Sequence, residues 1–127
     1  MKKERKHYHC DWAAVPGEAA RFENLVASHL LKWVEYQVDA QGRDLELRYF
    51  RDIDGREVDF VITERLQPIA MVECKLGDDE PGKGLEYLKA RFPSAEAWQI
   101  ALNGRRDFES ALGIRVAPAH RLLRDLV

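Results

Sequence analysis

The chain has 127 residues, of which 33% are charged and 46% belong to the hydrophobic set, and its formal net charge is −2. This length predicts a single domain, residues 1–127, with enough apolar side chains to bury its own core. The near-neutral charge argues against a generally basic nucleic-acid coat, and no apolar stretch is long enough to span a bilayer. We therefore expect no membrane partner. Because Cys10 and Cys74 are the only cysteines, we also expect a cytoplasmic protein with reduced thiols.

The first elements predicted along the chain are an N-terminal segment and a long helix. Lys6 to Asp11 fits either a short strand or a frayed arm. A helix is predicted to begin at Pro16-Gly17-Glu18 and to end at Gln41-Gly42, because apolar residues recur there at spacings of three and four. The residues of this predicted buried face are Ala19, Phe22, Leu25, Val26, His29, Leu30, Trp33 and Val34.

The remainder of the chain predicts an α/β fold. Asp54-Gly55 is typical of a hairpin turn, and it separates two segments with the alternation of half-buried strands. The predicted elements, in chain order, are strands at 45–50, 57–63 and 69–75, a loop at 77–82, a helix at 85–92, a strand at 97–102, a short helix at 107–112, a strand at 114–117 and a last helix beginning at Pro118. The predicted order is therefore helix, three antiparallel strands, helix, strand and a short mixed tail.

Charged residues interrupt two of the predicted strands. Because side chains alternate between the two faces of a strand, Asp59 is predicted to lie opposite the apolar Val58, Phe60 and Ile62. Glu73 and Lys75 are predicted to share one face of the next strand. If these strands pair as a hairpin, Asp59 lies beside Glu73 and Lys75 near one edge of the sheet.

Two interpretations of this cluster stay open. Buried carboxylates that lie side by side raise each other's pKa unless a positive charge lies between them. Lys75 supplies part of that charge, and a divalent ion would supply more, because Asp59 and Glu73 offer hard oxygen ligands suited to Mg²⁺ or Mn²⁺. The backbone carbonyl of Cys74 is a further candidate ligand, and such an ion would polarise a phosphoryl oxygen. The alternative is a buried ion-pair network without chemistry.

The spacing of Asp59 and Glu73-Cys74-Lys75 resembles the D…(D/E)-x-K site of the PD-(D/E)XK nuclease superfamily. The predicted order of elements is similar to the restriction-endonuclease-like core of that superfamily, over about residues 22–102. The resemblance implies catalytic roles for Asp59, Glu73 and Lys75, and metal binding by Asp59, Glu73 and the Cys74 carbonyl. Glu23 matches a glutamate that many of these nucleases use on the first helix, whereas Val58 replaces the proline that leads the superfamily motif.

A closer resemblance lies in four segments, RFENLVASHLLKW, YFRDIDGREVDFVI, VECK and GLEYLKARF. They look like the C-terminal domain of unknown function that is attached to bacterial and archaeal AAA-type ATPases. The resemblance implies that an ATPase region precedes this domain. No nucleotide site is predicted within the chain, although residues 77–84 fit G-x-x-x-x-G-K, because Gly84 replaces the Mg²⁺-binding hydroxyl and three acidic residues would repel phosphates.

Two functions follow from these observations. The first is a metal-dependent phosphodiesterase that acts on DNA in preference to RNA, with Arg48, Arg51 and Arg56 holding the phosphate backbone. The alternative is a non-catalytic nuclease-like module that docks nucleic acid or serves assembly with an ATPase region or as a homodimer. The three arginines also fit an ordinary solvated surface.

Zinc binding is a separate possibility that we do not favour. His7, His9 and Cys10 lie close together in the sequence. Alternate residues on one strand present at most two good ligands, and no second cluster completes a tetrahedron. The sequence therefore predicts a polar N-terminal segment without a metal.

Overall fold

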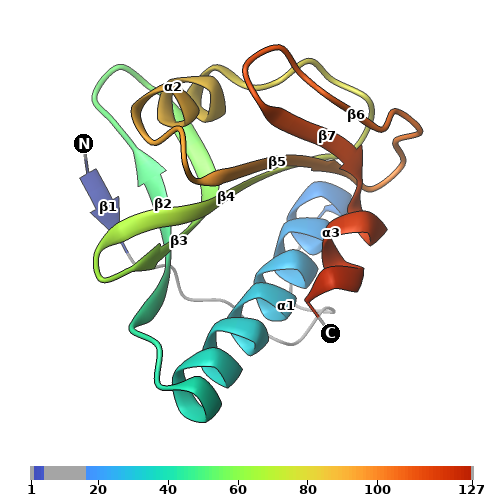
Figure 1. Cartoon of the computed structure of the whole chain (residues 1–127). Helices are drawn as coiled ribbons and strands as arrows, with labels where there is room; N and C mark the ends of the chain where they lie inside the picture. Colours follow the sequence, from blue (N-terminus) through green and yellow to red (C-terminus); the bar gives the residue numbers. More distant parts are fainter. Residues whose placement is uncertain (1, 5–16, 127) are drawn as a thin grey trace.

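The computed structural model describes residues 2–4 and 17–126, and it shows a mixed α/β fold (Figure 1). The predicted order of a helix, three antiparallel strands, a helix and a strand is confirmed. The elements are β1 (Lys2–Glu4), α1 (Glu18–Gln41), β2 (Leu45–Arg51), β3 (Glu57–Glu64), β4 (Gln67–Lys75), α2 (Lys83–Arg91), β5 (Glu96–Ala101), β6 (Phe108–Glu109), β7 (Ile114–Pro118) and α3 (Ala119–Asp125). The predicted strand at 6–11 and the residues His7, His9 and Cys10 lie outside the described ranges.

The strands form one sheet with the order β1-β2-β3-β4-β5-β7-β6. Strands β1 to β4 pair antiparallel, whereas β4, β5 and β7 pair parallel. Parallel neighbours need a crossover connection, and α2 lies on the connection from β4 to β5. The carboxyl ends of β4 and β5 therefore meet at one end of the sheet, where the predicted residues Glu73 and Lys75 lie.

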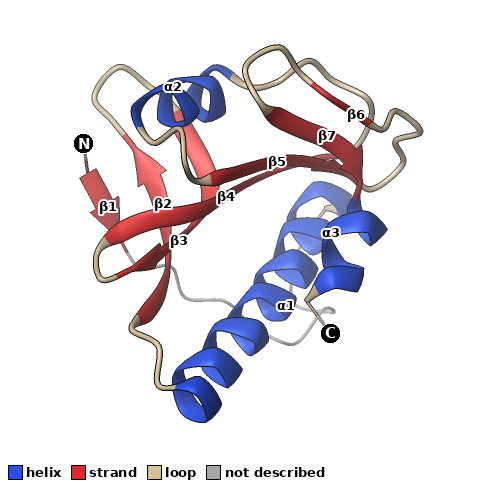
Figure 2. Ribbon diagram, viewed as in Figure 1, coloured by secondary structure: helices blue, strands red, loops and turns tan. Residues whose placement is uncertain are grey.

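Helices cover both faces of the sheet, as Figure 2 shows. Helices α1 and α3 pack on one face, over a core cluster that includes Leu30, Phe60 and Val72. Helix α2 packs on the other face, over a second cluster that includes Met71 and Leu85. Because both faces are covered, a polar side chain within a strand is buried, except near the ends of the strand.

The long helix α1 follows the apolar pattern of the sequence closely. Phe22, Val26, Leu30 and Val34 are buried as predicted, whereas Ala19 is exposed. The remaining predicted members, Leu25, His29 and Trp33, are partly buried. Gly42 ends the helix in the left-handed region at φ 66°, and the amides of residues 42 and 43 donate to the carbonyls of residues 38 and 37.

The prediction of a short helix at Asp107–Leu112 is wrong. Phe108 and Glu109 form strand β6, which pairs antiparallel with β7 at the edge of the sheet. A turn at Gly113, with φ 84°, connects the two strands, and the Ile114 amide donates to Ser110 Oγ. Pairing with β7 overrides a local helical preference here, because tertiary contacts outweigh propensity in short segments.

Of the three helices that the structure describes, none combines the length and the apolar character needed to cross a lipid bilayer.

Candidate active site

Asp59 lies at an irregularity in strand β3. Arg48 pairs with Val61 and Phe50 pairs with Val58, so the two residues Asp59 and Phe60 face a single residue of β2. This arrangement is a β-bulge, which leaves one residue outside the ladder and redirects its side chain. The bulge also corrects the predicted faces, because Val58 packs beneath α2 while Phe60 and Ile62 pack beneath α1.

The carboxylate of Asp59 is held by the backbone of strand β4. The ladder between β3 and β4 ends at Phe60 and Val72, and beyond it Asp59 Oδ2 accepts the Cys74 amide at 2.9 Å. The amide and carbonyl of one strand residue point to the same side, so the Cys74 carbonyl also faces strand β3. The Lys75 carbonyl points to the opposite side, where it accepts the Leu102 amide at 3.0 Å.

Glu73 is a buried carboxyl in direct contact with Asp59. Its side chain follows Met71 on the α2 face of the sheet, and the residue is only 9% exposed. Burial raises the pKa of Glu73 to about 9, with a further contribution from its hydrogen bond to Asp59 and from the charge of that residue. Glu73 is therefore protonated at neutral pH, and the two carboxyl groups form one site.

Two further charged groups act on this carboxyl pair. Lys75 lowers the pKa of Glu73, whereas the negative charge of Glu23 raises it. Strand alternation places Lys75 on the same face as Glu73, and Glu23 comes from the first turns of α1. The structure thus brings together the four residues that the sequence predicted: Asp59, Glu73, Lys75 and Glu23.

The composition of this site fits a magnesium-sized ion with few protein ligands. Among the described residues, no group of three or more His, Cys, Asp or Glu side chains is arranged to hold a metal ion. The carboxyl groups of Asp59 and Glu73, with the Cys74 carbonyl nearby, offer two side chains and one backbone oxygen. Mg²⁺ in proteins is usually bound by one or two carboxylates and retains several waters, so this donor set is sufficient.

Sequence reasoning missed a buried glutamine beside this pair. Gln99 on β5 is paired in register with Glu73 on β4, and it is 2% exposed. Its amide nitrogen donates to the carbonyls of Asp79 and Glu80, and its oxygen accepts the Gly82 amide. The signal in the sequence was a single polar residue within the apolar run from Ala97 to Leu102.

The glycine-rich loop at residues 77–84 serves packing. A Cβ added at Gly84 would lie 2.1 Å from the Glu57 carbonyl oxygen, so α2 approaches strand β3 more closely than another residue would permit. The Asp78 carboxylate accepts the amides of Arg105 and Arg106, which lowers its pKa. These contacts bind the loop to its own chain.

Each of the three candidate phosphate-binding arginines is paired within the β2–β3 hairpin. Arg48 pairs with Glu46, Arg51 with Glu57 at 2.9 Å, and Arg56 with Asp52 at 2.7 Å. Arg56 also lies over the ring of Tyr87 on α2, 3.8 Å from its centroid. A phosphate that binds these arginines would have to compete with the carboxylates that already hold them.

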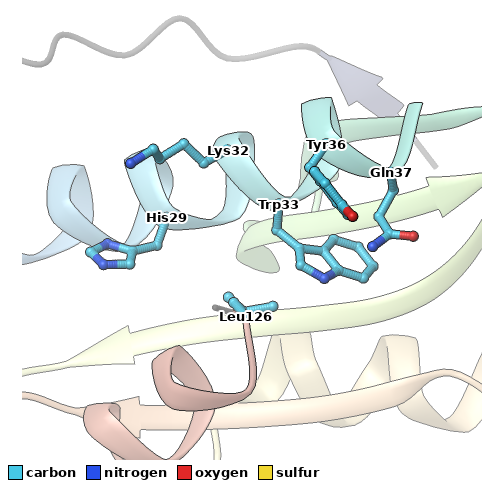
Figure 3. A pocket seen from close by; sticks show the side chains of 6 residues that line it. All are labelled: His29, Lys32, Trp33, Tyr36, Gln37 and Leu126. Atoms are coloured by element: carbon cyan, nitrogen blue, oxygen red, sulfur yellow. The ribbon is translucent and has the colours of Figure 1, made fainter. Parts of the chain in front are cut away.

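A separate hollow of about 440 Å³ lies along helix α1. Figure 3 shows its lining, which consists of side chains from α1 and of Leu126 after α3. Trp33 and Tyr36 make the hollow largely apolar, and it includes none of the candidate site residues.

The fold and the site together define an α/β protein with a buried carboxyl pair at the end of a mixed sheet. Residues 19–122 match the family described as Domain of unknown function (DUF4143), and the chain belongs to that family. The matched span includes Glu23, Asp59, Glu73 and Lys75. No curated protein and no solved structure matches the chain.

Proposed function

We propose that this chain is a metal-dependent nuclease domain of the PD-(D/E)XK type that hydrolyses phosphodiester bonds in DNA. The observation that carries the proposal is the contact between the carboxyl groups of Asp59 and Glu73, with Lys75 and Glu23 within electrostatic reach. Perturbed carboxyl groups that share one site are typical of catalytic and metal-binding positions.

In this proposal Asp59 and Glu73 hold Mg²⁺ or Mn²⁺, with the Cys74 carbonyl as a further ligand. When bound, the ion supplies polarisation of a phosphoryl oxygen. The proton on Glu73 must leave when the ion binds, because carboxylate ligands bind metals in their ionised form. Glu23 adds negative charge near the site and is an outer contributor to cation affinity.

In this proposal Lys75 acts on the substrate. Its ammonium group is near Glu73, and within the described part of the chain no carboxylate lies within ion-pair distance of it. A positive group that is not bound to a carboxylate offsets charge that develops on a phosphate in the transition state. Arg48, Arg51 and Arg56 contribute to substrate binding in this proposal by exchanging their hairpin carboxylates for phosphates.

The alternative function, a non-catalytic module that docks nucleic acid or assembles with an upstream ATPase region, has one observation in its favour. All three arginines are already paired with carboxylates of their own hairpin. In that alternative the carboxyl pair would keep its proton and bind no ion.

A metal titration tests the proposal. Thermal unfolding is measured with increasing Mn²⁺ or Mg²⁺ for the wild type, for Asp59→Asn and for Asp39→Asn, which makes the same chemical change at an exposed position of α1. At a free ion concentration 100 times the dissociation constant, binding adds about 2.7 kcal/mol to the free energy of unfolding. We expect this stabilisation in the wild type and in Asp39→Asn and its loss in Asp59→Asn.

Cleavage assays then separate the two functions. Labelled duplex, single-stranded and branched DNA are incubated with the wild type and with Lys75→Met in the presence of Mg²⁺. Under the nuclease proposal the wild type cleaves at least one substrate, and Lys75→Met binds the ion without cleaving. Ion binding without cleavage of any substrate would contradict the nuclease activity, and no ion binding would refute the metal site itself and favour the non-catalytic module.

A further inference from the structure

Gln99 makes three hydrogen bonds from a fully enclosed position, and all of them go to one loop. Its amide nitrogen donates to the Asp79 carbonyl at 2.9 Å and to the Glu80 carbonyl at 3.0 Å. Its oxygen accepts the Gly82 amide at 3.0 Å. Both N–H donors of the side chain are thus used, and the loop between β4 and α2 is fixed to strand β5.

The loop that Gln99 holds is the one that lies against Glu73. A Cβ added at Gly82 would be 3.6 Å from Glu73 Oε2 and 3.9 Å from the Gln99 side-chain oxygen. Glu73 and Gln99 are also direct neighbours in the parallel register of β4 and β5. The backbone of Gly82 therefore lies directly against the Glu73 carboxyl.

We propose that Gln99 is a positioning residue for cation binding, which seats residues 79–82 against Glu73 and directs its carboxyl toward Asp59. The inference rests on the proposed metal site and adds a residue to it that touches neither ion nor substrate. Residues that orient metal ligands from outside the coordination sphere typically change metal affinity by about 10–100-fold when they are replaced. Without the three bonds, the loop releases the Glu73 carboxyl, which then adopts orientations that do not face Asp59.

The experiment compares Mn²⁺ affinity with stability in the full chain. Isothermal titration calorimetry gives the dissociation constant for the wild type, for Gln99→Met and for Ile100→Val. Methionine preserves the unbranched shape of glutamine without its hydrogen bonds. Ile100 is the next residue on β5, is fully buried and packs on the α1 face, so Ile100→Val lowers stability without touching the loop. Gln99→Asn, which is too short to reach the loop, replaces Gln99→Met if that variant does not fold.

We expect the dissociation constant to rise about 10–100-fold in Gln99→Met, as for a residue that orients a metal ligand from outside the coordination sphere. In Ile100→Val we expect it to rise less than about twofold. A purely structural role predicts that both variants lose stability and keep the wild-type affinity. If the wild type binds Mn²⁺ and Gln99→Met binds it within twofold as tightly, the positioning role is refuted while the metal site stands. If the wild type binds no Mn²⁺, both the metal site and the positioning role are refuted.

Discussion

At the scale of single residues, the site depends on a carboxyl group that is buried where water cannot stabilise its charge. Glu73 is enclosed by the sheet and by Gly82, and its nearest acidic neighbour, Asp59, is fixed by the Cys74 amide. Burial and Asp59 raise the pKa of Glu73 to about 9, while Lys75 opposes this rise. The carboxyl pair is thus destabilised when both groups are ionised, and this cost is what a proton or a cation relieves.

Because ionised Glu73 is destabilised in the native state, we expect the stability of the metal-free protein to depend on pH. The folded pKa of Glu73, about 9, lies above its ordinary value of 4.5, so the native state binds the proton more tightly than the unfolded chain. The stability that the native state gains from binding this proton is fully present below pH 4.5 and is lost as the pH rises through 9. We expect the free energy of unfolding, measured with urea in the presence of a chelator, to fall between pH 6 and pH 9.

The matched variant for this prediction is Glu73→Gln. Glutamine is neutral at every pH and has nearly the same shape, so we expect a much flatter dependence of stability on pH between 6 and 9. Carboxylates with a lowered pKa, such as Asp78 and Glu64, lose their contribution only as the pH falls and do not affect this window. Equal slopes for the wild type and Glu73→Gln would show that Glu73 is ionised at neutral pH.

The sequence predicted the members of the site but not the way in which they are held. Alternation along the strand put Glu73 and Lys75 on one face, the motif spacing singled out Asp59, and the structure brings Asp59 and Lys75 close enough to shift the pKa of Glu73. The bulge was not predictable, because one additional residue in β3 opposite Tyr49 leaves no pattern in the sequence and is visible only in the register. Gln99 was missed because its role depends on three partners distant from it in sequence.

At the scale of elements, the turn between β3 and β4 is strained. Arg65 and Leu66 form a two-residue hairpin loop, and both have positive φ angles, 51° and 69°. This geometry suits the twist of the strands but favours Asn or Gly, because a Cβ atom makes the left-handed region costly. The sequence placed the turn approximately, at a segment ending at Pro68, since neither residue is a turn former.

We therefore expect Leu66→Gly to stabilise the protein. Relief of the left-handed strain outweighs the added freedom of the unfolded chain, for a net gain of about 0.5–1 kcal/mol. Leu112→Gly is the matched control, since Leu112 is similarly exposed but has no positive φ angle, and this change should destabilise slightly. Both are measured by urea denaturation, and a loss of stability in Leu66→Gly would contradict the assigned turn geometry.

The contact between α2 and β3 gives a second prediction for elements. Gly84 packs directly on the Glu57 backbone, and an added Cβ would overlap its carbonyl oxygen at 2.1 Å. Gly84→Ala should therefore destabilise by about 2 kcal/mol, despite the better helix propensity of alanine, because helix and strand must separate. Gly77→Ala, with no atom within 4 Å of the added Cβ, is expected to leave thermal stability nearly unchanged.

Equal thermal stabilities of Gly84→Ala and Gly77→Ala would contradict this packing. The spacing of the glycines fits a phosphate loop, and the sequence argued against that use only through Gly84 itself and the acidic residues of the loop. What decides the role of Gly84 is the approach of a strand from elsewhere in the chain.

At the scale of the whole molecule, the site lies where the antiparallel and parallel parts of the sheet meet. Strand β4 pairs with β3 on one side and with β5 on the other, and it contributes Glu73, Cys74 and Lys75. Figure 1 shows α1 and α2 on opposite faces of the sheet. Glu23 belongs to α1, and Gly82 directly precedes α2. The order of elements was predictable from local patterns, whereas β6 depended on pairing across the sheet edge and was predicted as a helix.

A direct test of the metal site is the anomalous scattering of Mn²⁺ in crystals of the full chain, grown near pH 8 and compared with crystals of Asp59→Asn. We expect one ion that contacts both the Asp59 and the Glu73 carboxylates in the wild type and is absent in the variant. An Asp59 side chain that points away from Glu73, or an ion bound elsewhere with this pair left protonated, would contradict it.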